Sequence, residues 1–457
     1  MVLPRLKITV IGGGLAGCEA AWQAARRGVA VRLYDMKPER FSPAHSSPLL
    51  AELVCSNSLR ASDPANAVGL LKEEMRRLDS LIIGAALATQ VPAGRALAVD
   101  RAAFAAKITE TLSAHPAIEI IRQEIRELPP ENGEPLILAT GPLTSDTMAK
   151  SLADFTGEEG LSFYDAIAPI VAAESLDRAI IYQKSRYDEE GPGDYLNCPL
   201  TKDEYYNFIN ELRNGRCVPL RDFEEAKYFE GCLPIEVLRA RGDNTLRFGP
   251  MKPVGLADPK TGRPPYAVVQ LRREDKDGAS YNMVGFQTKL TYSEQGRIFR
   301  LIPGLEKAEF LRLGSIHRNT FIRAPKILTP SLQTRKRPTL FIAGQLAGVE
   351  GYVESAAMGL LAGINAARLA TGLAPAPPPP ETALGALVRH LTESDPAHFQ
   401  PSNVTFGLFP PWADGKMGKK LRGQKRAEMA LTALETWRTV VNVGEGVLDA
   451  QSTVLGK

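Results

Sequence analysis

Three glycines near the start of the chain have the spacing of a nucleotide-binding turn. Gly12, Gly14 and Gly17 form the pattern G-x-G-x-x-G between the apolar run 8–11 and an Ala-rich helical pattern that continues through residue 27. The first glycine of this pattern permits a tight turn, the second lets backbone N–H groups approach a pyrophosphate, and the third lets helix and strand pack closely. A pyrophosphate placed there would lie at a helix N-terminus, where negative charge is favoured.

An acidic residue follows at the distance that this interpretation requires. Asp35 ends a second apolar strand, 29–34, and lies 18 residues after Gly17. A carboxylate near this distance typically binds the ribose of an adenosine. The strand, the helix and the acid together predict a site for an ADP-containing dinucleotide, with NAD and FAD equally compatible. The alternative is an α/β turn without a ligand.

A second Gly-rich segment occurs late in the chain. The predicted strand 339–343 is followed by the sequence GQLAGVEG, 344–351, and then by an Ala- and Gly-rich helix over 356–370. Small residues would let the chain cross close to a cofactor here, whereas the alternative is a close-packed core helix without a ligand. Together with the small-residue turn ATG at 139–141, this second segment favours FAD over NAD.

The thiols and imidazoles show no spacing for a disulfide framework or a metal. The five cysteines are odd in number, contain no C-x-x-C pair, and are Cys18, Cys55, Cys198, Cys217 and Cys232. This pattern argues against a disulfide framework, a zinc knuckle and a dithiol redox motif, but single thiols with chemistry stay possible. No metal-ligand spacing relates His45, His115, His390 and His398 to one another, so no metal is predicted.

Strands and helices alternate between these sites. The hydrophobic spacing predicts helices over 66–90 and 100–113, and strands over 118–121 and 135–141. Such alternation is typical of an α/β protein with a doubly wound parallel sheet, the Rossmann-like arrangement.

The middle of the chain has a different composition. Tyr and Phe become frequent from 163 to 229, and the alternation over 266–271 predicts a strand of another module. We therefore expect a smaller α+β domain inserted into the α/β domain. The predicted division is 1–161 for the first part of the cofactor domain, 162–309 for the inserted domain, and 310–457 for the second part, with a Pro-rich linker at 375–380 and a C-terminal helical segment over 423–441.

Length and composition indicate an ordinary soluble protein with more than one domain. The chain has 457 residues and exceeds the roughly 250–300 residues at which single cores stop growing. Its net charge of +3 means that a nucleic acid would have to meet a local basic surface. The longest apolar run, 81–88, is far shorter than the roughly 20 residues that cross a bilayer, and the first strand leaves no room for a secretory signal. We expect a cytoplasmic enzyme.

Four stretches together resemble one family of flavoproteins. They are GGGLAG with Asp35, LVCSNSLR, the ATG turn and GQLAGVEGYVESAAMGLLAGINAA, and they resemble the FAD- and folate-dependent tRNA (uracil-5-)-methyltransferases. AVVQLRRE, NMVGFQT, LIPGLEKAEF and HRNTFI extend the resemblance over most of the chain. Larger flavoproteins that modify the wobble uridine of tRNA share the GQ…GY signature but carry a long C-terminal helical extension. Because this chain leaves little sequence after its linker, the resemblance favours the shorter methyltransferases.

The resemblance implies a reaction and its reactants. In that reaction 5,10-methylenetetrahydrofolate supplies the carbon, reduced FAD supplies the hydride, NAD(P)H reduces the flavin, and carbon 5 of a T-loop uridine in tRNA receives the methyl group. Carbon 5 of uracil becomes nucleophilic only after addition at carbon 6, for which a thiolate is suited. By resemblance, Cys232 in FEGCLPIE adds to carbon 6, and Cys55 in LVCSNSLR lies near the flavin and removes the proton from carbon 5.

The remaining site residues are assigned on the same grounds. The predicted cofactor-binding residues are Gly12, Gly14, Gly17, Asp35, Gly344, Gln345 and Gly351. His317, in HRNTFI, is predicted to stack on the folate with Tyr352 nearby, and the alternative is a structural histidine. Cys18 and Cys217 are interpreted as structural, and Cys198 is assigned no chemistry.

Recognition of tRNA would favour a loop whose base can be splayed out and stacked. The candidate contacts are basic and aromatic: Tyr187, Tyr195, Tyr205, Tyr206, Arg213 and the stretch 416–426. The alternative is that these residues form solvated faces without a partner. Two other functions also stay open: a wobble-uridine-modifying enzyme, and a flavin-bound RNA-binding protein whose thiols are incidental.

Overall fold

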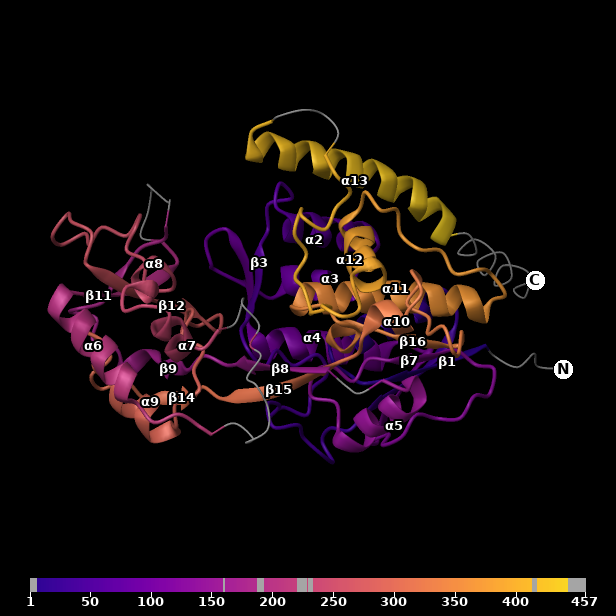
Figure 1. The fold of residues 1–457 in the computed structure, drawn as a ribbon, viewed down its shortest axis with the longest axis horizontal. Helices are drawn as coiled ribbons and strands as arrows, with labels where there is room; N and C mark the ends of the chain where they lie inside the picture. The colour runs from indigo at the N-terminus through magenta and orange to yellow at the C-terminus, as the bar shows by residue number, and fades with distance from the viewer. Residues whose placement is uncertain are drawn as a thin grey trace.

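A five-stranded parallel sheet lies at the centre of the larger part of the molecule (Figure 1). The computed structural model describes residues 6–158, 161–186, 193–219, 228, 233–412 and 417–442. The sheet has the order β16-β7-β1-β2-β6. Its strands are β1 (Lys7–Ile11), β2 (Ala30–Asp35), β6 (Ile118–Arg122), β7 (Leu136–Leu138) and β16 (Leu340–Ile342).

The strand order explains the doubly wound fold. From β1 the chain passes to β2 and β6 on one side, whereas β7 and β16 lie on the other side, and every neighbouring pair is parallel. The apolar side chains of β1 and β16, such as Ile8, Val10 and Phe341, are fully buried. A parallel sheet covered on both faces requires such apolar strands. The predicted α/β class with a Rossmann-like parallel sheet is confirmed.

Two helices cover the sheet and contact each other closely. They are α1 (Leu15–Arg26) and α11 (Tyr352–Ala370), and glycines of α11 lie against the backbone of α1. A Cβ atom on Gly359 would overlap the carbonyl oxygen of Ala16, and one on Gly363 would overlap that of Ala20. The small residues predicted to permit close packing here therefore bring the two helix backbones together.

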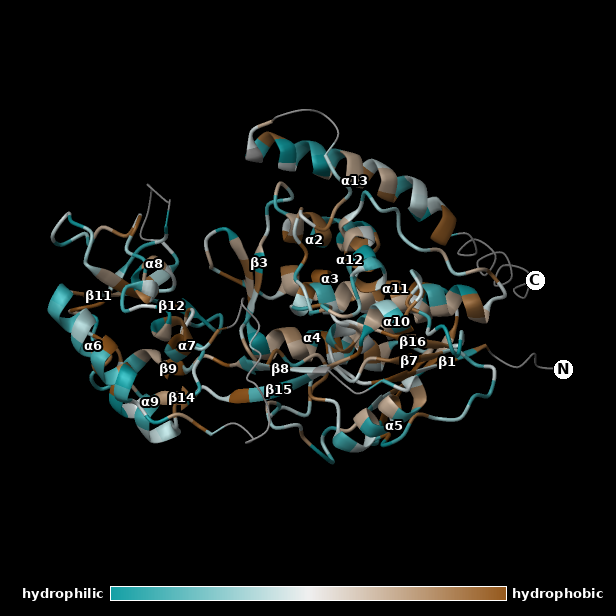
Figure 2. Ribbon diagram, in the orientation of Figure 1, coloured by the Kyte–Doolittle hydropathy of each residue, from teal (hydrophilic) through white to brown (hydrophobic). Residues whose placement is uncertain are grey.

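The remaining helices of this part surround the sheet. They are α2 (Ala67–Arg77), α3 (Leu81–Ala88), α4 (Arg101–Ala114), α5 (Asp146–Thr156), α10 (Ala324–Ile327), α12 (Ala383–Glu393) and α13 (Lys419–Val441), with a 3₁₀ turn at η3 (Gly344–Ala347). Figure 1 shows α13 at the top of the view, across α2 and α12. Figure 2 shows hydrophilic residues along the N-terminal part of α13 and hydrophobic residues in the sheet. None of the helices in the described ranges is long and apolar enough to cross a membrane.

The single helix predicted over 66–90 is wrong, because α2 and α3 are separate helices. Asp79, between them, has a left-handed backbone with φ of 56°. The Ser80 hydroxyl oxygen accepts the N–H of Ile83 at 3.2 Å, and the hydroxyl donates to the buried carboxylate of Glu19 at 2.6 Å. Ser80 therefore caps a new helix, and the pair Asp-Ser was the sequence signal for this break.

A six-stranded antiparallel sheet organises the smaller part, at the left of Figure 1. Its order is β10-β11-β12-β13-β9-β14, with β9 (Ile170–Ala172), β10 (Tyr182–Gln183), β11 (Tyr195–Leu200), β12 (Ala267–Arg273), β13 (Ser280–Met283) and β14 (Phe310–Arg312). It is accompanied by η1 (Ala173–Ser175), α6 (Lys202–Asn214), α7 (Ile235–Ala240), α8 (Thr245–Phe248) and α9 (Tyr292–Phe299). Its hydrophobic cluster is separate from that of the parallel sheet. The boundaries 162–309 stay a prediction.

Two small sheets lie between these parts. Strands β8 (Leu161–Ala166) and β15 (Ile316–Phe321) pair antiparallel, so the chain leaves and re-enters the larger part side by side. Strands β3 (Ser58–Ala61), β4 (Gln90–Val91) and β5 (Ala96–Val99) form a three-stranded sheet in the order β3-β5-β4. The three-stranded sheet was not predicted. It matters for the site because β3 follows directly on the loop that contains Cys55.

Candidate active site

A cavity of about 170 Å³ lies at the C-terminal ends of the parallel strands. Ligands of doubly wound sheets bind at this edge, where the strand order reverses. The cavity is lined by both Gly-rich segments and by the ATG turn, including Gly12, Gly14, Asp35, Thr140, Gly141, Gly344, Gln345 and Tyr352. Five of the seven predicted cofactor-binding residues therefore share one cavity, and Gly17 and Gly351 lie outside its lining.

Gly12 and Gly17 are required by the turn itself. Gly12 has φ of 110°, and a Cβ atom on it would overlap the carbonyl oxygen of Ala139 in the neighbouring strand connection. A Cβ atom on Gly17 would overlap the carbonyl oxygen of Gly12. These two glycines let β7, β1 and α1 approach one another, which places the cavity directly at the start of α1.

Gly14 has a different role, because its position is open. Its backbone is extended, with φ of −78° and ψ of −172°, and a Cβ atom there would have no neighbour within 4 Å. It precedes α1, which has neither a side-chain cap nor an acidic residue in its first turn. The first residues of this helix line the cavity, and the free N–H groups of a helix N-terminus are suited to bind an anion. These residues therefore fit the pyrophosphate of a dinucleotide.

Asp35 is held in place by two backbone N–H groups. Its Oδ2 accepts the N–H of Gly13 at 2.9 Å, and its Oδ1 accepts that of Lys37 at 2.8 Å. A Cβ atom on Gly13 would overlap Oδ2, so only glycine permits this contact. The carboxylate is 7% exposed. Since each carboxylate oxygen has two lone pairs, Asp35 keeps acceptor capacity for a ribose hydroxyl.

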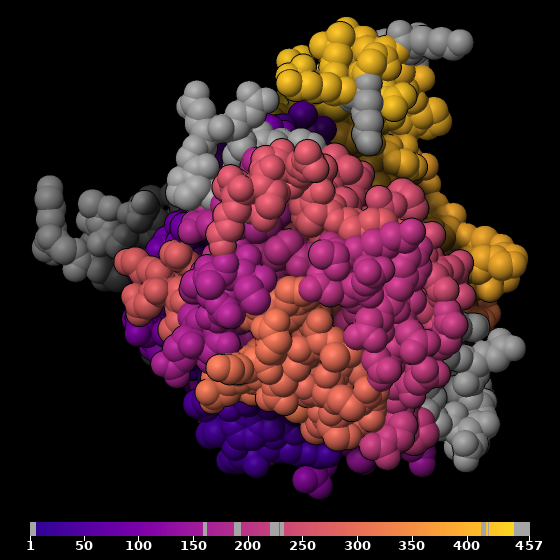
Figure 3. Space-filling view, turned by 90° about the vertical axis from the view of Figure 1, so that its left-hand side faces the viewer, coloured from indigo at the N-terminus to yellow at the C-terminus, as the bar shows by residue number. Residues whose placement is uncertain are grey.

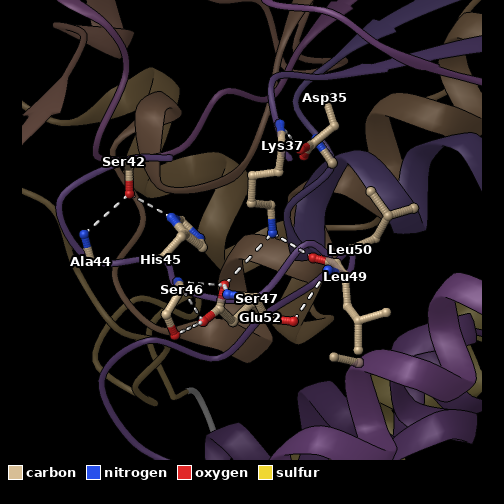
Figure 4. Close-up of polar contacts among 12 residues, drawn as sticks. Asp35, Lys37, Ser42, Ala44, His45, Ser46, Ser47, Leu49, Leu50 and Glu52 are labelled. Atoms are coloured by element: carbon tan, nitrogen blue, oxygen red, sulfur yellow. Dashed lines mark hydrogen bonds and ion pairs between the residues drawn. The ribbon is translucent and has the colours of Figure 1, made fainter. Parts of the chain in front are cut away.

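The loop 36–52 forms a polar wall of the cavity that was not predicted (Figure 4). Lys37 is buried, and its Nζ donates to the carbonyl oxygen of Leu49 at 2.5 Å and lies 3.8 Å from Glu52 Oε2. The Glu52 carboxylate also accepts the N–H groups of Ser46 and Ser47, at 3.0 and 3.1 Å. The only signal in the sequence was a concentration of ionisable residues directly after Asp35, because turn residues show no periodicity.

Two histidines interact electrostatically here, but only His45 belongs to the cavity lining, and His317 lies outside it. His45 lines the cavity, and its Nδ1 shares a hydrogen bond of 2.6 Å with Ser42 Oγ. Burial, followed by the positive charge of Lys37, lowers the pKa of His45. His317 Nε2 contacts Ser315 Oγ at 2.8 Å, and burial followed by the charges of Arg312 and His45 lowers the pKa of His317. Both imidazoles are therefore neutral at pH 7.

Tyr352 connects the cavity to the loop of Cys55. Its hydroxyl oxygen accepts the backbone N–H of Cys55 at 2.6 Å and that of Ser56 at 3.1 Å. Burial raises the pKa of Tyr352, so the hydroxyl stays protonated at neutral pH. The Cys55 side chain is partly exposed and its Sγ lies 3.8 Å from the carbonyl oxygen of Ala166. The structure thus brings Cys55, Tyr352 and the cavity together.

Two arginines hold the Cys55 loop from both sides. Arg101, from α4, donates to the carbonyl oxygen of Leu53 at 2.6 Å and pairs with Glu274 at 2.7 Å. Arg272, from β12 of the smaller part, donates to Asn57 Oδ1 at 2.9 Å and to Ser56 Oγ at 2.7 Å. The loop is therefore fixed by the cofactor domain and by the inserted strands at once.

The segment GVEGYVE, 348–354, places two further carboxylates beside this loop. Glu350 is buried, accepts Gln345 Nε2 at 2.5 Å, and has a pKa raised by burial. Glu354 is fully buried, pairs with Arg60, and accepts the N–H of Val404 at 2.9 Å. Gly351 has φ of 103°, and its Cβ atom would lie 2.5 Å from Glu354 Oε2. Gly351 thus makes room for Glu354, away from the cavity lining.

The other predicted residues have varied surroundings. Cys18 and Cys198 are fully buried, and burial raises the pKa of both thiols. Burial also raises the pKa of Cys217, which is half-buried.

Tyr205 is wrong as an RNA contact, because it is fully buried against α8. Tyr206, Arg213, Lys420, Arg422 and Lys425 are exposed. Cys232, Tyr187 and Lys416 lie outside the described residues. Within the part of the chain that is described, no group of His, Cys, Asp and Glu could hold a metal ion.

Comparison with protein families and curated proteins gives matches along nearly the whole chain. The model of the family "Glucose inhibited division protein A" matches residues 7–374. A protein of Desulfotalea psychrophila named methylenetetrahydrofolate--tRNA-(uracil-5-)-methyltransferase TrmFO is 63% identical over 96% of this chain and 99% of its own length. A protein of the same name from Geobacter sulfurreducens is 59% identical over 95% of this chain and 99% of its own length.

Solved structures show the same fold at low sequence identity. GidA of Aquifex aeolicus, in its form II crystal, matches with a TM-score of 0.66 and 17% identity, over 96% of this chain and 77% of that chain. Its form I crystal gives a TM-score of 0.67 over 95% of this chain and 78% of that chain. At this identity the comparison shows the arrangement of the elements and nothing finer.

Proposed function

Because the chain belongs to the glucose inhibited division protein A family, and within it to the methylenetetrahydrofolate--tRNA-(uracil-5-)-methyltransferases, we propose how its own residues serve that reaction. The protein transfers a one-carbon unit from 5,10-methylenetetrahydrofolate to carbon 5 of a uracil in tRNA, and FAD is its cofactor. A T-loop uridine as the target and NAD(P)H as the reductant are parts of the proposal.

The contact between Tyr352 and Cys55 carries the proposal. Tyr352 lines the cavity, and its hydroxyl holds the backbone of the loop that presents the Cys55 thiol. A redox cofactor in the cavity and a thiol at its edge are the two groups that reductive methylation of uracil needs. A flavin-bound scaffold without catalysis would not require this arrangement.

The cofactor is held by the residues that fit its parts. The start of α1 at Gly14 binds the pyrophosphate and Asp35 binds the adenosine ribose. Gly344 and Gln345, with Gly12 at the turn, let the chain pass close to the rest of the cofactor, and Gly17 and Gly351 support these backbones from outside the lining. When bound, reduced FAD supplies the hydride that completes the methyl group.

The thiols divide the work on the uracil ring. Cys55 Sγ removes the proton from carbon 5, and the fixed loop around it keeps the thiol at one place between the cavity and the inserted strands. Cys232 adds as a thiolate to carbon 6, which makes carbon 5 nucleophilic, and leaves as a thiolate when the ring double bond forms again. This role rests on family resemblance. The neutral His317 presents a flat surface for the folate beside Tyr352, and burial excludes water from this region.

Replacement of single thiols tests this division. We expect Cys55→Ala and Cys232→Ala each to abolish transfer of labelled carbon from folate to tRNA, while the purified proteins keep their visible flavin absorbance. Cys217→Ala is the matched control, because this half-buried thiol lies in the inserted part and has no role in the scheme. Retained methylation in Cys232→Ala would refute the thiol mechanism. Mapping the modified nucleotide separates a T-loop target from a wobble position.

A further inference from the structure

An aromatic cluster stands at the surface of the inserted part, away from the cavity. It consists of Tyr206, Arg247, Phe248 and Tyr266, which we call the Phe248 platform. The side chain of Phe248 is 71% exposed and that of Tyr206 is 36% exposed. The rings of Tyr206 and Tyr266 lie 6.0 Å apart, and their hydroxyl oxygens lie 3.2 Å apart. Figure 3 shows the face of the inserted part to which these elements belong.

Arg247 stacks within this cluster and has spare hydrogen-bond donors. Its guanidinium carbon lies 4.2 Å from the Tyr266 ring centre and 5.6 Å from that of Phe248. Its Nε donates to the carbonyl oxygen of Tyr266 at 2.9 Å. The nearby carboxylate of Asp243 pairs with Arg213 and Arg239, and not with Arg247. The outer donors of the guanidinium are therefore available to a ligand.

The platform is rigid because a buried tyrosine fixes it from below. Tyr205 lies in the core, where its hydroxyl donates to the carbonyl oxygen of Asp243 at 2.7 Å and accepts the N–H of Arg247 at 3.2 Å. Its ring lies 5.4 Å from that of Tyr206 and 5.5 Å from that of Tyr266. The exposed rings therefore need little ordering when a ligand binds, which favours affinity.

The border of the platform is basic. The segment 237–252 contains Arg239, Arg247 and Lys252, and its carboxylate, Asp243, pairs with Arg213 at 2.7 Å and with Arg239 at 3.8 Å. A surface hollow of about 550 Å³ begins beside Phe248 and is lined by Leu238, Gly242, Asp243, Asn244, Thr245 and Gly249. Exposed aromatic faces with arginine and a positive border are the features that bind unpaired bases and their phosphates.

Strand β12 relates the platform to the Cys55 loop. Tyr266 directly precedes the strand, and Arg272 near its other end donates to Ser56 and Asn57. Six residues at about 3.3 Å each separate the two positions by roughly 20 Å. This distance corresponds to about six stacked bases at 3.4 Å. A polynucleotide whose target base reaches Cys55 can therefore also reach the platform.

We propose that the Phe248 platform stacks an unpaired base of the tRNA substrate while Arg247 binds an adjacent phosphate. The inference rests on the proposed function, because it takes the tRNA whose uracil reacts at Cys55 as the ligand. It adds a second recognition point outside the reacting site. The platform thereby selects a folded tRNA over an isolated uridine.

Binding measurements on exposed-residue variants test this proposal. Phe248→Ala should weaken binding of unmodified tRNA by roughly fivefold or more, the loss expected for one base–aromatic stack, and Phe248→Trp should restore it. Arg247→Ala should lower the slope of log affinity against log salt by about 0.7–0.9. Tyr292→Ala is the control, since Tyr292 is another exposed aromatic residue. It lies on α9 and is 61% exposed.

Two further measurements separate this inference from the proposed function. Flavin content and NAD(P)H-driven flavin reduction without tRNA should equal wild type in every variant. Equal tRNA affinity and salt slope in Phe248→Ala, Arg247→Ala and wild type would overturn the platform, even if wild type methylates tRNA normally. A wild-type protein that neither binds nor methylates tRNA would instead overturn the function on which the inference rests.

Discussion

The hydroxyl oxygen of Tyr352 accepts a 2.6 Å hydrogen bond from the backbone N–H of Cys55, although 297 residues separate them in sequence. A second N–H, from Ser56, reaches the same oxygen at 3.1 Å. Since α11 begins at Tyr352, this contact ties the helix that follows the second Gly-rich segment to the loop before β3. The phenol therefore links the thiol directly to the cavity lining, whereas Arg101 and Arg272 hold the loop on either side of Cys55.

Tyr352→Phe removes this acceptor and should reduce catalysis without removing the cofactor. A buried donor left without a partner costs about 1–3 kcal/mol, so the Cys55 loop should shift or loosen. We expect kcat for methyl transfer to fall by roughly tenfold or more, since about 1.4 kcal/mol corresponds to a tenfold change in rate. The measurement is single-turnover transfer at saturating folate and tRNA, normalised to flavin content.

Tyr182→Phe is the matched control for this variant. The Tyr182 hydroxyl also bonds to buried backbone, but as a donor to the carbonyl oxygen of Leu256 at 2.7 Å, and it lies in the inserted part away from the cavity. Tyr182→Phe should lose a free energy of unfolding similar to that lost by Tyr352→Phe and should keep the wild-type kcat. Equal kcat in Tyr352→Phe and wild type would show that the phenol does not position the thiol.

The Gly-rich turn was predictable from sequence because its geometry is local. Gly12, Gly14 and Gly17 lie within one strand–turn–helix unit, and Asp35 follows at the end of the next strand, so spacing alone specifies their relative positions. The break between α2 and α3 was equally local. Ser80 is a helix-capping residue type, but the apolar spacing continues across it and predicts a single helix.

The contacts that assemble the site were not predictable from spacing. Arg272 reaches the Cys55 loop across 215 and 216 residues, to Asn57 and Ser56. Lys37 and Glu52 lie close in sequence, but their burial depends on how the loop folds over the cavity edge. Neither kind of contact leaves a periodic pattern, because each is fixed by the packing of the inserted part and the loop against the sheet.

Gly14 and Gly17 should respond differently to a side chain. A Cβ atom at Gly14 meets no neighbour and the backbone there is extended, so Gly14→Val should fold normally but fill the space at the start of α1. Its melting temperature without cofactor should match that of wild-type apoprotein, and its bound flavin should fall strongly. Flavin absorbance per protein and thermal unfolding of both apoproteins measure the two effects.

Gly17→Ala is the comparison, because its Cβ atom would overlap the carbonyl oxygen of Gly12. This variant should lose about 1–3 kcal/mol of unfolding free energy from overpacking, with or without FAD. If Gly14→Val retains full flavin content, the pyrophosphate does not lie at this helix end. If Gly17→Ala unfolds like wild type, the strand and helix are not as close as described.

Glu73 should make the stability of the fold depend on acid pH. Hydrogen bonds from Arg76, followed by those from Arg77, lower the pKa of Glu73 from 4.5 to about 2. A carboxyl whose folded pKa is lowered stabilises the protein above its unfolded pKa, and this contribution disappears as the pH falls toward the folded value. Because both arginines are partly exposed, the contribution is only about 0.5–1 kcal/mol.

Glu73→Gln should therefore unfold more easily than wild type near neutral pH and equally at about pH 2. Urea unfolding across this pH range measures the difference. Glu393→Gln is the control, because Glu393 pairs with Arg389 and is well exposed. A stability difference that stays constant from neutral to acid pH would exclude Glu73 as its electrostatic source.

His317 should control how folate binding responds to pH. Burial, then the charges of Arg312 and His45, lower the pKa of His317 from 6.5, so the imidazole is neutral above that pH and gains a proton only below it. A protonated ring would add a cation beside Arg312 and would disfavour the stacked folate. KM for methylenetetrahydrofolate should therefore be constant at about pH 7–8 and should rise as the pH falls below the lowered pKa.

His317→Asn should raise KM for folate at about pH 8 and remove its dependence on acid pH, with little change in bound FAD. His115→Asn is the matched control, because burial also lowers the pKa of His115, which contacts Trp22 instead of the cavity. Should the rise in KM at acid pH persist in His317→Asn, the titrating group is His45, which lines the cavity and has a lowered pKa of its own. The double variant His45→Asn/His317→Asn would then lose the acid response, because His45 is the only histidine of the described residues that lines the cavity.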